Sequence, residues 1–153
     1  MRVDIDSSLE GDWRTVRVRI LASSWGLVAD LTARLRTDVI GDGRAEATVQ
    51  IRQWRLALDV SGCETVLVPS DIDALVRGFE LMAAAVPVAG GPQILVIEVQ
   101  KLWYPLTDYQ PEAAMIAMAH WIAAHLDLDD PEFDIEFDRA DNRYLVIPQN
   151  GAT

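Results

Sequence analysis

The feature that most constrains this chain is the stretch from Val66 to Leu126, where helix and strand signals follow one another without a gap. Val66–Val68 is a short apolar run of strand character, and Pro69 stops it. Ser70 and the two aspartates after it are typical of a helix N-cap with an acidic first turn. The apolar residues that follow recur at three- and four-residue spacing and predict one buried helical face: Leu75, Val76, Phe79, Met82, Ala83 and Val86.

The second half of this stretch predicts another strand and another helix. Pro87 ends the first helix, and Gly90-Gly91-Pro92 supplies a turn. The β-branched run Ile94–Val99 predicts a short buried strand. A loop covers Trp103 to Gln110, and Pro111 fits the first turn of a second helix that runs to the end of the stretch.

The residues before position 44 predict a strand followed by a helix. Residues 14–20 alternate between apolar and polar side chains, which is typical of a strand with one buried face. This strand places Arg17 and Arg19 together on its wet face. Ser23-Ser24 offers an N-cap, and the glycines at positions 41 and 43 end a helix whose buried stripe consists of Leu27, Val28, Leu31, Leu35 and Val39.

The next residues predict further strands. Apolar and polar residues alternate from Ala45 to Val60, but the register breaks at Gln53, so either a bulge or a second strand begins there. Ser61-Gly62 is a turn signal. Cys63–Val68 then returns as a strand, which predicts a hairpin.

Two alternating segments near the end, Phe133–Asp138 and Arg143–Ile147, predict strands that close the sheet. No repeat, low-complexity tract or linker interrupts the chain, so residues 1–153 are expected to form one domain. Residues 1–12 and 149–153 are expected to be flexible tails.

Charge is unevenly distributed along the chain. The net charge is −11, and residues 1–60 contain nine basic and nine acidic side chains, so the whole excess lies in residues 61–153. Such a surface repels phosphate backbones, which argues against nucleic-acid binding by the C-terminal half but leaves an arginine-rich face in the N-terminal half. A basic protein partner is favoured instead. The alternative is that the negative charge only maintains solubility.

A cytoplasmic, soluble protein is expected. No apolar run approaches the roughly 20 residues that a membrane-spanning helix needs. Met1–Asp6 lacks the apolar core of a signal peptide. Cys63 is the only cysteine, which allows no intramolecular disulfide and predicts a small buried hydrophobe.

No motif indicates a cofactor, a metal ion or a catalytic group. The paired glycines match neither a phosphate loop nor the dinucleotide fingerprint. His120 and His125 stand about 140° apart around a helix axis, so they are not expected to chelate one metal ion. The acidic residues 127–132 lack the central glycine of a calcium loop. Nothing pairs a nucleophile with a base.

Two segments of the central stretch, Val68–Gly78 and Pro87–Pro92, resemble domain IV of elongation factor G and its relatives, which include the ribosomal protection proteins. In that family a valine-proline start leads into a helix containing alanine, valine and glycine, and a turn of proline and glycine follows at the same spacing. The loop after the next strand matches by residue type at Tyr104, Asp108 and Glu112 if Pro111 is an insertion.

The resemblance implies an α+β fold with a mixed, mainly antiparallel sheet, helices packed on one face and a left-handed crossover. The strand and helix before Val49 are then an extra N-terminal unit. Pro105 replaces the histidine of the translocases, the GTPase domains are absent, and the charge has the wrong sign for contact with ribosomal RNA. The resemblance therefore implies a stand-alone, translation-related domain and not translocation itself.

The function expected from these features is a non-catalytic module that binds a protein partner, ribosome-associated if the resemblance extends that far. Its loop presents Trp103, Tyr104, Asp108 and Tyr109 to the partner, since aromatic residues dominate binding energy when they are exposed together. The alternative is that Trp103 and Tyr104 only cap the core at the end of the strand.

Two other functions fit parts of the sequence. An acidic immunity or antagonist protein for a basic toxin fits the charge. A small enzyme would draw on Asp108, Glu112 or His120, although carboxylates at a helix start also simply satisfy the helix dipole. A pocket with perturbed carboxylates favours the enzyme, and a convex acidic surface with exposed aromatic residues favours the binder.

Overall fold

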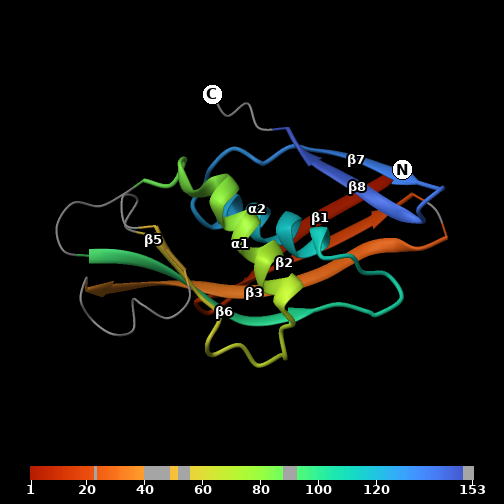
Figure 1. The fold of residues 1–153 in the computed structure, drawn as a ribbon. Helices are drawn as coiled ribbons and strands as arrows, with labels where there is room; N and C mark the ends of the chain where they lie inside the picture. The colour runs from red at the N-terminus through yellow and green to blue at the C-terminus, as the bar shows by residue number, and fades with distance from the viewer. Residues whose placement is uncertain (23, 40–48, 52–55, 88–92, 150–153) are drawn as a thin grey trace.

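The fold is built on a six-stranded sheet in the order β1-β2-β3-β6-β5-β4 (Figure 1). The computed structural model describes residues 1–22, 24–39, 49–51, 56–87 and 93–149. The elements in these residues are β1 (Arg2–Glu10), β2 (Trp13–Leu21), β3 (Gly26–Val39), β4 (Val49–Ile51), β5 (Leu56–Asp59), α1 (Pro69–Ala83), β6 (Gln93–Trp103), α2 (Glu112–His125), β7 (Phe133–Asp138) and β8 (Arg143–Pro148).

The sheet is mixed and mostly antiparallel. β1, β2 and β3 form an antiparallel meander, β3 continues antiparallel to β6, and β4 is antiparallel to β5. β5 and β6 run parallel, because the chain between them passes through α1 and returns to the same end of the sheet. These pairings confirm the α+β class and the mixed, mainly antiparallel sheet.

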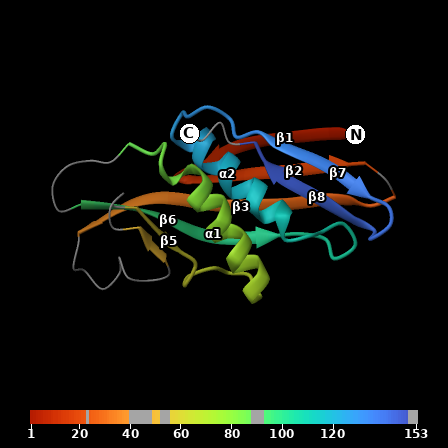
Figure 2. The same cartoon turned by 45° about the horizontal axis from the view of Figure 1, so that its top comes forward.

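Both helices lie on one face of the sheet (Figures 1 and 2). α2 packs on β2 and β3, and α1 packs beside α2. α2 is covered by the sheet on one side and by α1 on another. Its residues are apolar on nearly every side, as expected for a helix inside a core. Its buried residues include Met115, Met118 and Trp121, and all three are fully buried.

The hairpin β7–β8 lies apart from the main sheet and forms a sheet of its own. It is attached through Tyr144, which is fully buried and donates its hydroxyl hydrogen to the carbonyl oxygen of Trp25. The side chain of Gln110 also binds the backbone of Tyr144, accepting from its nitrogen at 2.8 Å and donating to its oxygen at 2.7 Å. The two strands were predicted correctly, but the prediction that they close the main sheet is wrong, because side chains and not backbone pairing hold them.

The predicted helix over residues 24–39 is wrong, because these residues form β3. Leu27, Leu31 and Leu35 are four residues apart, and that spacing fits one face of a strand as well as one face of a helix. Pairing with β2 on one side and β6 on the other satisfies the backbone groups of the segment along both of its edges. The extra N-terminal unit is therefore a meander of strands.

Residues 1–12 also differ from the prediction of a tail. Arg2–Glu10 forms β1, which pairs with β2 along its whole length, and a turn with Gly11 at a φ of 60° joins the two strands. The charged residues of β1 occupy one face of this edge strand, where charge is tolerated. Residues 150–153, 41–43 and 90–92, for which a tail and turns were predicted, lie outside the described residues.

The central stretch follows the prediction except at its beginning. α1, β6 and α2 lie where helix, strand and helix were predicted. Cys63–Val68, however, is not a strand, so the predicted hairpin across Ser61-Gly62 is wrong. β4 and β5 do pair, so a second strand follows the break predicted at Gln53, which itself lies outside the described residues. The N-cap of α1 is Val68 and not Ser70, because Pro69 occupies the first helical position.

Candidate binding surface

The loop after β6 folds back against the start of α1. Tyr104 and Tyr109 stack with their ring centroids 3.5 Å apart and their planes 6° from parallel. Both hydroxyl groups donate hydrogen bonds to the carboxylate of Asp71, at 2.9 Å from Tyr104 and 2.7 Å from Tyr109. The same carboxylate accepts a hydrogen bond from the backbone nitrogen of Val68 at 3.4 Å.

Asp71 is fully buried, so these hydrogen bonds replace the water that an exposed carboxylate would bind. Burial raises the pKa of Tyr109 far above its ordinary value, and the negative charge of Asp71 raises it further. The pKa of Tyr104 is raised by the same two causes. Both tyrosines therefore stay protonated and act as permanent donors.

Asp108 fastens the other side of the loop. Its Oδ1 atom accepts a hydrogen bond of 2.8 Å from the backbone nitrogen of Gly26, and its backbone oxygen accepts one of 2.8 Å from Val28. Three of the four predicted binding residues thus hold their own chain together. For Tyr104 this matches the alternative that it caps the core.

Trp103 is placed differently from the rest of the loop. It ends β6 on the face of the sheet opposite the helices and is 44% exposed. Val16, Val18 and Ile20 point into the core, so the alternating residues of β2 face the same side as Trp103. A groove of about 400 Å³ lies on this open face, lined by Thr15, Arg17, Arg19, Asp30, Thr32, Lys101 and Trp103.

The groove carries more positive than negative charge, although the chain as a whole is acidic. The guanidinium carbon of Arg19 lies 6.0 Å from the ring centroid of Trp103, and the Nη1 atom of Arg19 lies 2.6 Å from Asp30. Arg17 donates to Ser8 at 3.0 Å. Lys101 is exposed and forms no ion pair with any described residue.

Sequence reasoning found only part of this groove. It placed Arg17 and Arg19 together on a wet strand face, and the structure confirms this. It missed Asp30 and Thr32, because residues 24–39 were predicted to be a helix. The alternation of residues 27–33 was the signal that could have identified this strand. Its odd-numbered residues all lie on one buried face: Leu27, Ala29, Leu31 and Ala33.

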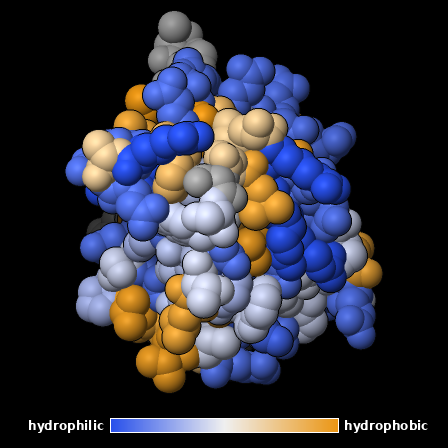
Figure 3. Space-filling model, turned by 90° about the vertical axis from the view of Figure 1, so that its right-hand side faces the viewer, coloured by the Kyte–Doolittle hydropathy of each residue, from blue (hydrophilic) through white to orange (hydrophobic). Residues whose placement is uncertain are grey.

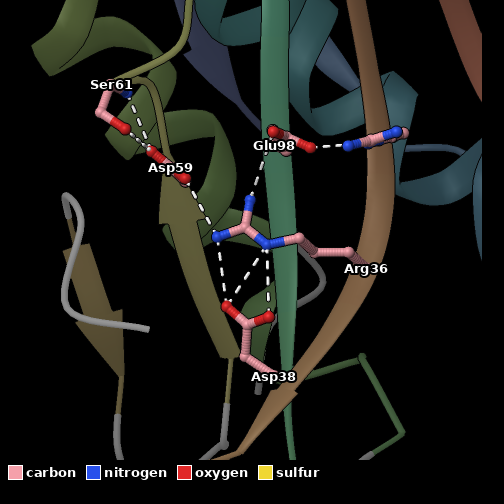
Figure 4. Close-up of polar contacts among 6 residues, drawn as sticks. Arg36, Asp38, Asp59, Ser61 and Glu98 are labelled. Atoms are coloured by element: carbon pink, nitrogen blue, oxygen red, sulfur yellow. Dashed lines mark hydrogen bonds and ion pairs between the residues drawn. The ribbon is translucent and has the colours of Figure 1, made fainter. Parts of the chain in front are cut away.

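A second polar cluster lies further along the sheet face opposite the helices, around Arg36, where Asp38 and Asp59 are buried (Figure 4). The guanidinium group of Arg36 lies 3.2 Å from Asp38, 3.0 Å from Asp59 and 3.6 Å from Glu98. Burial alone would raise the pKa of Asp59, but the hydrogen bonds from Ser61 and the charge of Arg36 outweigh it and lower the pKa. This cluster joins β3, β5 and β6, so its role is to hold the sheet together.

The candidate catalytic residues do not form one site. Asp108 is bound to Gly26, and Glu112 accepts a 2.6 Å hydrogen bond from Gln110. His120 lies two helical turns beyond Glu112 on α2, about 12 Å along the axis. Burial lowers the pKa of His120, which the charge of Asp130 partly opposes. Within the described residues, no group of histidine, cysteine and carboxylate side chains could hold a metal ion.

Residues 127–141 form an acidic surface that includes β7 and part of the turn to β8. Eight of its side chains are acidic and one, Arg139, is basic. Asp134 and Glu136 are exposed and Ile135 between them is buried, so these two carboxylates of β7 face outward. Figure 3 shows hydrophilic residues over most of the end of the molecule that carries the β7–β8 turn, with smaller hydrophobic patches between them.

The chain matches no described protein family, and no characterised protein shows significant sequence similarity to it. No helix in the described residues is both long enough and apolar enough to cross a membrane.

Proposed function

We propose that this chain is a non-catalytic protein-interaction module that binds its partner in the groove on the open sheet face, with Trp103 as the central contact. The observation that carries this proposal is the exposure of Trp103 next to Arg19 in a groove that also contains Arg17 and Lys101. Tryptophan and arginine are the residue types that contribute most to protein interfaces. The cations suit a partner segment that bears carboxylate groups.

We also propose a relation to domain IV of elongation factor G, and this relation concerns the fold alone. The order α1, β6, α2 and the parallel pairing of β5 with β6 support it. Tyr104 and Asp108, which match the family loop by type, bind Asp71 and Gly26 within the chain. A translation-related or ribosome-associated partner is therefore one candidate for the groove and not a requirement of it.

The test is affinity capture of partners by the parent protein and three variants, followed by binding measurements with the captured protein. Trp103→Ala and Lys101→Glu are expected to weaken binding at least tenfold. Leu106→Ala is the matched control, because Leu106 is 91% exposed in the same loop but does not line the groove. Equal binding by all four proteins would place the interface elsewhere.

A second function, antagonism of a basic protein such as a toxin, is favoured by the acidic surface of residues 127–141. Its test uses the same capture with Asp134→Lys/Glu136→Lys. Loss of the partner in this double variant and at high salt, with binding intact in Trp103→Ala, would favour the antagonist over the groove.

A further inference from the structure

Strand β1, nine residues long, lies at the edge of the main sheet. It pairs with β2 from Arg2 opposite Leu21 to Glu10 opposite Trp13. No described strand pairs with its other edge. That edge therefore presents a row of backbone N–H and C=O groups that can pair with another strand. β1 contains no lysine, proline or bulge, and its charged side chains are of both signs, so a strand with the opposite order of charges can still pair with this edge.

The two faces of β1 differ in chemistry. Val3, Ile5 and Leu9 point to the helix side together with Ser7, and Val3 is 47% and Leu9 56% exposed. The opposite face carries Arg2, Asp4, Asp6, Ser8 and Glu10. A strand added to this edge must match apolar side chains on one face and opposite charges on the other.

We propose that a second copy of this chain binds this edge, with the two β1 strands antiparallel and related by a twofold axis at Asp6. In this register Val3 lies opposite Leu9 of the second copy, and Arg2 lies opposite Glu10 of the second copy. All nine residues of β1 are paired, and the sheets of the two copies become continuous. A symmetric interface needs a self-complementary patch, and this strand is one.

Charge selects this register over its neighbours. Only shifts by two residues keep the apolar face of both strands on the helix side. One such shift places Asp4 opposite Asp6, and the other places Asp4 opposite Glu10. Both lose the pairing of Arg2 with Glu10 and create like-charge pairs, which destabilise a sheet.

The centre of the interface has one unfavourable contact, where Asp6 of each copy faces its equivalent. Arg17 offsets this repulsion, because its Nη1 atom lies 3.5 Å from Asp6 in each copy. On the helix side, Val3 and Ile5 line a hollow of about 300 Å³ that extends to His120 and Ala124. Leu9 of the second copy reaches the rim of this hollow, where burying it removes apolar surface from water.

The first test is a charge swap followed by sedimentation equilibrium. The parent is expected to be a dimer, and Arg2→Glu or Glu10→Arg is expected to weaken dimerisation about tenfold, because each creates two like-charge pairs across the axis. The double variant Arg2→Glu/Glu10→Arg restores opposite charges and is expected to restore the dimer. Arg77→Glu is the control, since it makes the same charge change on an exposed position of α1.

The second test reads the register directly by oxidative cross-linking in a Cys63→Ser background. Asp6→Cys is expected to form a disulfide-linked dimer, because residue 6 faces itself, whereas Asp4→Cys faces Ser8 and is expected to remain monomeric on denaturing gels. A monomeric parent overturns the proposal. So does a dimer that the charge swap leaves unchanged, or one that cross-links through Asp4→Cys and not Asp6→Cys.

Discussion

Tyr109 donates a 2.7 Å hydrogen bond to Asp71, a carboxylate that is fully buried at the start of α1. Tyr104, whose ring is stacked on that of Tyr109, donates a hydrogen bond to the same carboxylate. A single acidic residue thus connects the N-terminus of a helix to a loop more than thirty residues later in the chain. This contact keeps the loop closed and leaves Trp103 as its exposed aromatic residue on the open sheet face.

Replacement of this carboxylate is predicted to destabilise the protein strongly. Asp71→Ala leaves the half-buried hydroxyl groups of Tyr104 and Tyr109 without their acceptor, which is expected to lower the free energy of unfolding by about 1–3 kcal/mol. Asp73→Ala is the control, because Asp73 is an exposed carboxylate in the same helical turn. Urea unfolding measures both variants. Similar losses in the two would show that the effect comes from the helix dipole and not from the tyrosines.

The Arg36 cluster predicts a second large loss of stability. Arg36→Met retains much of the side-chain volume but leaves the buried Asp38 and Asp59 without their cation, and is expected to cost about 2–4 kcal/mol of unfolding free energy. Arg36→Lys is expected to lose less unfolding free energy than Arg36→Met, because lysine keeps the positive charge. Some loss is still expected, because lysine lacks the planar guanidinium group. A value for Arg36→Met no larger than that of the exposed control Arg77→Met would contradict the structural role of the cluster.

Acidification is predicted to weaken the fold first through its histidines. Burial lowers the pKa of His125 below 6.5, and the charge of Arg14 lowers it further. The unfolded chain therefore binds more protons than the folded one once the pH falls below about 6.5, so stability decreases there and levels off below the folded pKa. Asp59, whose pKa is lowered, contributes stability that is lost only at more acidic pH.

His125→Gln tests this assignment by urea unfolding between pH 7.5 and 5. The neutral ring of His125 accepts a 3.3 Å hydrogen bond from Arg14 through Nδ1, and the amide oxygen of glutamine also accepts but does not titrate. We expect a shallower decrease of stability with acid in the variant than in the parent. Identical slopes in the two proteins would assign the decrease to other groups, with His120 next.

Gly78 is predicted to be essential for the packing of α1 on α2. A Cβ atom at this position would lie 2.4 Å from the backbone oxygen of Met115, so the helices would have to separate. Gly78→Ala is therefore expected to destabilise the protein by about 1–3 kcal/mol, although alanine is the better helix former. Gly62→Ala is the control, because nothing lies within 4 Å of a Cβ atom there. A stabilised Gly78→Ala variant would show that the helices adjust freely.

Several elements could be predicted from local sequence because one signal dominated each. The proline at position 69 and the apolar spacing through Phe79 and Met82 identified α1. The β-branched run at Ile94 identified β6, although the strand continues to Trp103. The candidate site was predicted less well. Trp103 was chosen as a candidate and is exposed, but its neighbours in the groove come largely from β2 and β3, and only the pairing of those strands brings them together.

The sequence by itself determined the alternation of β2, the two helices and the acidic character of the C-terminal half, because each depends on residues close together in the chain. Tertiary structure decided the rest. The spacing of Leu27, Leu31 and Leu35 suits a helix and a strand equally, and β2 and β6 select the strand by pairing with both of its edges. Asp71 has the pattern of an ordinary first-turn acid. It becomes the acceptor for Tyr104 and Tyr109 only because packing brings the distant loop to the helix and removes water from the carboxylate.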